Sequence, residues 1–358
     1  MKRFDALWLF NGTVWLDYTN NTRNNTAISF ISDSVSYFYF GMRNRFIGLY
    51  TTLSTIGAYT GLIYEYWDGV TWNKLSLIDT YNWTESKYVR WVLPHSDWMK
   101  YNFVDGTPHP QEPPDNVERY WMRIRCTGAT ATAIMSELRC ISYPSYTIPI
   151  KVSQFLQFKK DFDYNTTPKD IVVEDLIRRA EDLIDYRTRK SWRFNAVSEE
   201  QDPILVDFNR YGMFLRHRNF LKVYAVYLWN GSSWQALVEG RNNDYFVNYN
   251  LGLIYFTRLY MLPAIYGMTG RYSTWGLGEF KNSIKVDYVY GRNSETDPEF
   301  HLVEDIATKM AAVDILRHHD YSNMIVAGTD KVSLDNKIAL LNEEIESKID
   351  NLTGISIV

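Results

Sequence analysis

Three short segments of this chain share one spacing, in which an aromatic side chain, Asn or Asp, and Gly are followed by two further residues and a Trp. They are residues 10–15, 67–72 and 229–234. Because Asn-Gly and Asp-Gly accept positive φ at low cost, the segments predict tight hairpin turns. If four residues form each loop, the two aromatic side chains face each other across the strands, a contact that contributes roughly 0.2–1 kcal/mol. The chain is therefore predicted to consist largely of aromatic-rich β-hairpins.

The length and charge of the chain limit the partners that it can have. With 358 residues it is long enough for two domains. Residues 1–150 carry 13 basic and 13 acidic side chains, and the remainder carries 25 basic and 29 acidic ones. Neither part is a basic domain, so neither is expected to attract nucleic acid in general. No stretch approaches the ~20 apolar residues of a membrane helix, and the first five residues are not expected to be a secretion signal.

Residues 1–145 show the pattern of short strands separated by turns. Strands are expected within residues 27–40, 45–50, 62–67, 88–93 and 120–125. In the last of these, basic residues alternate with apolar ones, which predicts one solvated face. Many short strands with turn signals between them favour an all-β sandwich or jelly-roll-like domain. Cys126 and Cys140 are expected to flank a hairpin and to be reduced and buried.

The second part of the chain has the periodicity of helices as well as strands. A linker is expected at residues 146–165, before an α+β domain at 166–358. An amphipathic helix is predicted over residues 168–192 and a second over 298–319, each beginning with a capping residue followed by Pro. A β meander is expected between them, over about residues 221–290. A third helix is predicted from Ser333, and its narrow apolar seam fits a partner helix in another subunit or in the same chain.

The motifs of common enzymes are absent from the sequence. It has no phosphate-binding loop, no dinucleotide fingerprint and no Gly-X-Ser-X-Gly elbow. None of the six histidines has a zinc spacing with the two cysteines, and His318-His319 is interpreted as a favourable cationic pair at a helix end. We therefore expect no enzymatic activity, no metal site and no cofactor.

The order of elements in the second part resembles a known family. A leading amphipathic helix at residues 168–192 is followed by strands at 221–290, a second helix at 298–319 and a helical tail. This order is similar to that of the head–tail connector (adaptor) proteins of tailed bacteriophages, in which a small helical core carries a β insertion. The resemblance covers about residues 165–358. In the first part, residues 66–72 and 118–124 are similar in texture to β-sandwich modules fused to phage structural proteins.

The resemblance implies a virion structural protein that forms a homo-oligomeric ring, with twelve subunits expected, in the portal and neck region. One face would meet the portal protein and the other a tail or neck protein, while DNA passes through the channel without specific binding. The protein would stay in the host cytoplasm during assembly, and no membrane is involved. Two alternatives remain open: another phage tail or baseplate component, and a carbohydrate-binding protein that stacks sugars on exposed Trp67, Trp72, Trp91 or Trp98.

Two segments are candidate contact sites. The C-terminal end is apolar and β-prone, and we expect Leu352, Ile355, Ile357 and Val358 to contact the portal, for example by adding a strand to a sheet edge. The long segment 259–282 is the candidate for contacts between neighbouring subunits. Its candidate residues are Gly267, Gly270, Arg271, Tyr272, Gly276 and Gly278. A loop of this length is often functional, and a surface excursion without function fits the sequence equally.

Overall fold

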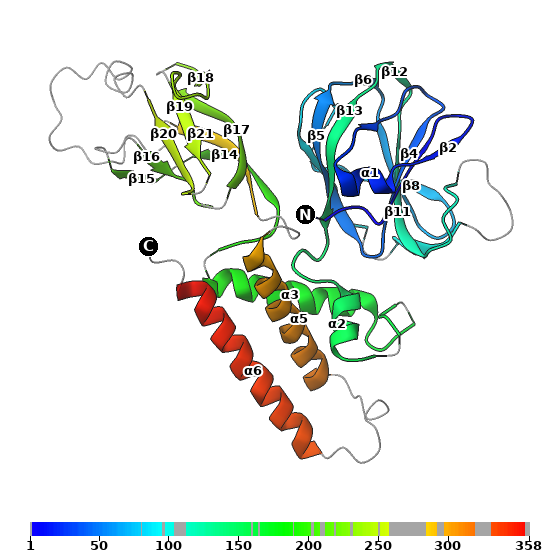
Figure 1. Ribbon diagram of the computed structural model, residues 1–358, viewed down its shortest axis with the longest axis vertical. Coiled ribbons are helices and arrows are strands. Elements are labelled where there is room, and N and C mark those ends of the chain that lie inside the picture. The colour runs from blue at the N-terminus through cyan, green and yellow to red at the C-terminus, as the bar shows by residue number, and fades with distance from the viewer. Residues whose placement is uncertain are drawn as a thin grey trace. The chain divides into compact units, whose positions relative to one another are not determined.

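The computed structural model describes most of the chain (Figure 1). The described residues are 2–79, 81–94, 97–103, 112–158, 160–163, 165–188, 190–201, 204–207, 212–217, 220–229, 232–249, 251–257, 284–291, 297–318 and 331–354. The fold is mixed α+β, as the sequence predicts. The chain divides into two compact units. Unit 1 comprises Met1–Glu181, Ser294–Thr296 and His301–Lys348, and unit 2 comprises Asp182–Asn293, Asp297–Phe300 and Ile349–Val358.

The strands of unit 1 form two main antiparallel sheets. The first has the order β2-β1-β4-β11-β7-β8, with β10 beside β11. Its strands are β1 (Ala6–Phe10), β2 (Trp15–Asp17), β4 (Tyr37–Met42), β7 (Ile63–Trp67), β8 (Trp72–Lys74), β10 (Lys100–Tyr101) and β11 (Arg119–Arg125). The second has the order β3-β13-β5-β9, with β3 (Ile28–Ser29), β5 (Phe46–Thr55), β9 (Tyr88–Arg90) and β13 (Ile134–Ser142). A short ladder joins β6 (Ala58–Thr60) to β12 (Gly128–Ala131), and the small helix α1 spans Thr19–Asn24.

Side chains from both sheets share one core, so the N-terminal part is a β-sandwich. Phe38, Phe40 and Ile124 of the first sheet belong to the same buried cluster as Leu49 and Leu138 of the second. Alternate residues of each strand supply this core because successive side chains of a strand point to opposite faces. Cys126 and Cys140 are both buried and unbonded, as expected.

The turn motif forms hairpins as predicted. Phe10 pairs with Trp15 and Trp67 with Trp72, with ring centroids 5.0 Å and 5.3 Å apart. In the second hairpin the Asp68 carboxylate accepts hydrogen bonds from the backbone N–H groups of residues 70 and 71, at 2.7 Å each. These bonds lower the pKa of Asp68 below its ordinary value. Strand pairing places Trp229 opposite Trp234 in the third copy as well.

The glycine of this turn offers a direct test of the hairpin geometry. Gly69 has φ of 100°, and an added Cβ would meet only Met99 at an ordinary 3.5 Å. Gly69→Ala is therefore expected to cost about 1–2 kcal/mol of unfolding free energy through backbone strain alone. The neighbouring Val70 is 84% exposed, so Val70→Ala should leave stability nearly unchanged. Urea unfolding of both variants measures the difference, and equal stabilities would contradict the turn geometry.

Two expectations for the sandwich are wrong. Cys126 and Cys140 do not flank a hairpin, because β11 and β13 belong to different sheets. The outer face of β11 is not simply solvated either, since Trp121 lies fully buried there in a second aromatic cluster. Arg123 on the same face lies over the Trp72 ring, 4.4 Å from its centroid, and binds Glu65 at 2.7 Å. Basic residues that alternate with apolar ones do not always mark a solvated face, because their guanidinium groups can also cover aromatic side chains.

Besides α1, further helices lie wholly or mainly in unit 1. They are α2 (Pro149–Phe155), α3 (Asp170–Thr188), α5 (Pro298–His318) and α6 (Lys331–Gly354), of which α3, α5 and α6 were predicted and α2 lies within the expected linker. Val152, Ile177 and Ile315 belong to a buried cluster that joins α2, α3 and α5. Helix α3 begins at Asp170 rather than Pro168, after a turn in which Thr166 donates to the carbonyl of Pro168.

The apolar seam of α6 packs within the chain, which is one of the two alternatives left open. Ile338 and Ile345 are buried. Lys309 of α5 binds Glu344 of α6 at 2.6 Å, and Lys348 binds the same carboxylate. Hydrogen bonds from these two lysines lower the pKa of Glu344 to about 2.

Unit 2 contains two four-stranded antiparallel sheets, with the orders β14-β21-β17-β18 and β15-β16-β20-β19. Their strands are β14 (Asn195–Gln201), β15 (Ile204–Asp207), β16 (Gly212–Phe214), β17 (Phe220–Trp229), β18 (Trp234–Ala236), β19 (Tyr245–Asn248), β20 (Leu253–Phe256) and β21 (Ile284–Tyr290). Val226 and Val286 of one sheet share a buried core with Met213 and Ile254 of the other. The sequence predicted β17 to β21 but not β14 to β16. The strands are not a plain meander, because β21 lies between β14 and β17.

Candidate functional site

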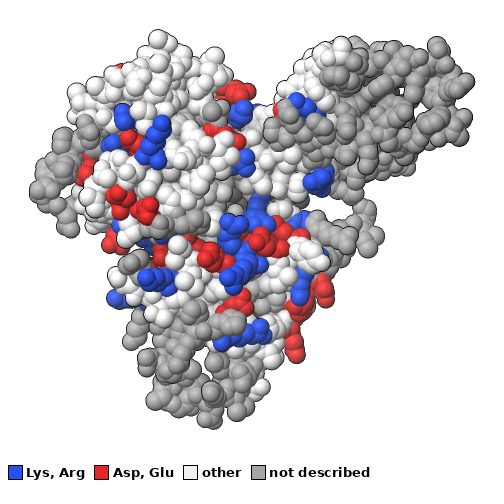
Figure 2. All heavy atoms as spheres, turned by 180° about the vertical axis from the view of Figure 1, so that it is seen from behind, with Lys and Arg blue, Asp and Glu red and all other residues white. Residues whose placement is uncertain are grey.

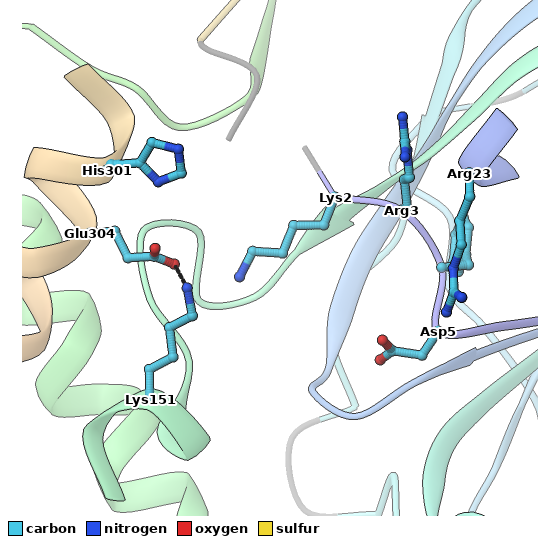
Figure 3. Close-up of a pocket in the computed structure, with 8 residues that line it drawn as sticks. Lys2, Arg3, Asp5, Arg23, Lys151, His301 and Glu304 are labelled. Carbon is cyan, nitrogen blue, oxygen red and sulfur yellow. Dashed lines mark ion pairs between the residues drawn. The ribbon is translucent and has the colours of Figure 1, made fainter. Parts of the chain in front are cut away.

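Unit 1 contains a charged pocket of about 520 Å³ (Figure 3). It is lined by Lys2, Arg3, Phe4, Asp5, Arg23, Lys151, His301 and Glu304. Lys2 to Asp5 precede β1, Arg23 lies on α1, Lys151 lies on α2, and His301 and Glu304 lie on α5. No pattern in the sequence indicates this pocket, because its lining residues come from four separate stretches of the chain.

The carboxylates of the pocket are already engaged. Glu304 binds Lys151 with an oxygen–nitrogen distance of 2.5 Å. Asp5 accepts a hydrogen bond of 2.8 Å from the backbone N–H of Arg43. Figure 3 shows the Lys2 side chain reaching across the cavity toward Glu304 and Lys151. Burial lowers the pKa of Lys2 below its ordinary value, although the negative charge of Glu304 acts in the opposite sense.

A second charged cluster, buried in unit 1, joins the sandwich to helix α3. The Arg45 guanidinium lies 2.9 Å from both oxygens of Glu174 and 3.4 Å from Asp170. The Tyr120 hydroxyl donates to Asp170 at 2.7 Å, and the Tyr120 ring lies 4.7 Å from the Arg45 guanidinium. All these groups are buried, so the cluster is a structural tie that water does not screen.

Burial raises the pKa of Glu174 to about 7, in spite of the neighbouring Arg45. The folded state thus holds a proton that the unfolded state releases near pH 4.5. The stabilisation is fully present below that pH and is lost as the pH rises through about 7.

Glu174→Gln removes this proton-dependent contribution and makes it measurable. Relative to this variant, the unchanged protein should lose about 3 kcal/mol of unfolding free energy from acidic to neutral pH. Denaturant unfolding at several pH values compares the two proteins. A difference that stays constant across that range would show that Glu174 titrates normally.

The tryptophans considered as sugar platforms are mostly covered. Trp67, Trp91 and Trp98 are buried, and Trp72 is half-buried against Trp67 and the Arg123 guanidinium. Buried indoles cannot stack on a ligand without unfolding their surroundings. The low exposure of these four side chains therefore favours a packing role over carbohydrate binding.

The predicted contact residues are only partly within the described chain. Leu352 is fully buried, and its carbonyl accepts a hydrogen bond from Lys190 at 3.4 Å, within unit 2. Ile355, Ile357 and Val358 lie outside the described residues, as do Gly267, Gly270, Arg271, Tyr272, Gly276 and Gly278. The contact roles of all these residues stay predictions.

The surface charges are of both signs. On the face drawn in Figure 2, Lys and Arg side chains are interspersed with Asp and Glu side chains.

Among the described residues, no group of three or more His, Cys, Asp or Glu side chains has the arrangement of a metal site. None of the described helices has both the length and the apolar character that crossing a bilayer requires.

Comparison with known proteins gives a weak likeness to solved structures. No protein-family model and no curated protein matches the chain. A solved structure described as the neck of an empty GTA particle, computed with C6 symmetry, matches with 16% identity and a TM-score of 0.30. The match covers 56% of this chain and 91% of that chain. At this TM-score the likeness carries no argument about fold or function.

Proposed function

We propose that the chain is a virion structural protein of a tailed phage, an adaptor that forms a ring at the neck beneath the portal. The observation that carries the proposal is the order of elements in its second part. Helix α3, the strands of unit 2, α5 and α6 follow one another in the order of the connector family. A twelve-subunit ring, with the portal on one face and a tail or neck protein on the other, belongs to the same proposal.

The chemistry of the described residues supports a structural role over catalysis. The largest aromatic side chains and the charged groups around Arg45 are committed to packing and to internal ion pairs. The mixed surface charge suits a channel that DNA crosses, because a broad positive field would retain the DNA. We assign no enzymatic activity. A tail or baseplate component is the second candidate, since it would use the same interaction chemistry with other partners.

The proposed tail contact can be tested by truncation. Because Leu352 is buried in its own unit, the deletion should remove only residues 355–358. The truncated chain is expected to stay folded and to lose binding to the portal protein of the same virus, measured by co-sedimentation. Leu340→Ser is the matched control, because Leu340 is an apolar α6 residue that is 65% exposed and lies outside the tail. Full binding by the truncated chain would contradict the tail assignment.

A further inference from the structure

The backbone of Lys2 is held in place by hydrogen bonds, and its ammonium group lacks an acceptor among the described residues. Its backbone N–H donates to the carbonyl of Cys140 at 3.0 Å, and the N–H of Cys140 donates back at 2.7 Å. The side chain therefore starts from a rigid strand edge. Within the described residues, none accepts a hydrogen bond from the ammonium. The Lys2 residue as a whole is half-buried, so its ammonium keeps access to an incoming ligand while part of its side chain is covered.

The surroundings supply more positive than negative charge. Arg3, Arg23 and Lys151 line the same cavity as Lys2, against the carboxylates of Asp5 and Glu304. Both carboxylates have partners of their own, the backbone of Arg43 and the Lys151 ammonium. What the cavity lacks is therefore a negatively charged acceptor. Its volume of about 520 Å³ admits a phosphate or carboxylate group together with water.

We propose that this pocket binds a compact oxyanion, a phosphate or a carboxylate group, through the Lys2 ammonium. The guest accepts hydrogen bonds from the Lys2 ammonium, and Lys151 is the neighbouring cation toward which that side chain points (Figure 3). Charge-assisted hydrogen bonds of this type are the strong ones in proteins. The two carboxylates of the lining make the pocket unsuited to a long polyanion, whose further charges they would repel. The inference concerns unit 1 and is independent of the role proposed for the neck.

Isothermal titration of the untagged full chain tests the proposal, with inorganic phosphate in one arm and succinate in the other, at constant ionic strength. Each anion that binds should do so once per chain. Lys2→Met is expected to weaken binding about tenfold or more, the loss of one charge-assisted hydrogen bond. Lys337→Met is the matched control, because Lys337 is an exposed lysine of α6, and it should bind as the unchanged protein does. If only one of the two anions binds, that result identifies the ligand group as a phosphate or as a carboxylate. If neither anion binds, or if binding is unchanged in Lys2→Met, the proposal is overturned.

A second measurement covers the case in which Lys2→Met disturbs the fold. Because its pKa is lowered, the Lys2 amine should react with acetic anhydride near neutral pH faster than exposed lysines do. The bound anion should slow acetylation of Lys2 and leave that of Lys337 unchanged, as peptide mass mapping would show. An acetylation rate at Lys2 that neither anion alters would also overturn the proposal.

Discussion

Replacing Arg45 by Met is expected to lower the unfolding free energy of unit 1 by about 3–5 kcal/mol, because it leaves two buried carboxylates without their cation. Glu174 loses two contacts of 2.9 Å and Asp170 one of 3.4 Å. The Tyr120 ring also loses the guanidinium that lies over it. Urea unfolding followed by tryptophan fluorescence measures the loss.

Two further variants separate broken charge pairing from lost packing. At pH values well above 7, adding Glu174→Gln to Arg45→Met should restore part of the stability, since it removes a carboxylate that would otherwise be buried and charged without a cation. Arg125→Met is the control on a more exposed arginine, whose partner Glu65 keeps Arg123. It should cost about 1 kcal/mol or less. If Arg45→Met costs no more than Arg125→Met, the buried cluster is not the tie that the distances indicate.

Trp98→Ala is expected to cost about 3–5 kcal/mol, as truncation of a large core aromatic does. Trp98 is fully buried, and its indole N–H donates to the carbonyl of Trp121 at 3.0 Å. Its ring packs 5.0 Å from that of Phe46. Trp98→Phe keeps most of the packing but leaves that carbonyl without its donor, so an intermediate loss is expected.

The same variant separates packing from carbohydrate binding. A sugar platform could be truncated with little loss of stability and a clear loss of glycan binding. We expect the reverse for Trp98, and a smaller loss for Trp72→Ala, because Trp72 is half-buried. A stable Trp98→Ala protein with weakened glycan binding would favour the carbohydrate-binding alternative.

Local signals explain which elements could be predicted from the sequence. The Asn-Gly and Asp-Gly turns fix their hairpins through side-chain bonds to residues two and three positions away, such as those of Asp68. The Asp297-Pro298 pair predicts the start of helix α5 correctly. The Asp297 carboxylate accepts a hydrogen bond from the backbone N–H of Glu299, so the capping contact lies within one turn. Such contacts join residues that are close in the sequence, so a short sequence pattern is enough to predict them.

The remaining features depend on contacts between distant parts of the chain. Arg45 and Glu174 are 129 residues apart, and the pocket at Lys2 joins strand, helix and loop residues from both ends of unit 1. The sheet partners of β11 and β13 do not follow from the sequence, because these strands are close in the chain but belong to different sheets. Leu183 of α3 is an apolar residue that is 38% exposed, because helical periodicity predicts which face of a helix is apolar but not which other elements cover that face.

Imaging the purified chain by negative-stain electron microscopy, alone and after addition of the portal protein of the same virus, tests the neck assignment most directly. The proposal predicts closed rings of many copies, formed by the chain alone or once the portal is present. Particles that remain single chains under both conditions would contradict it.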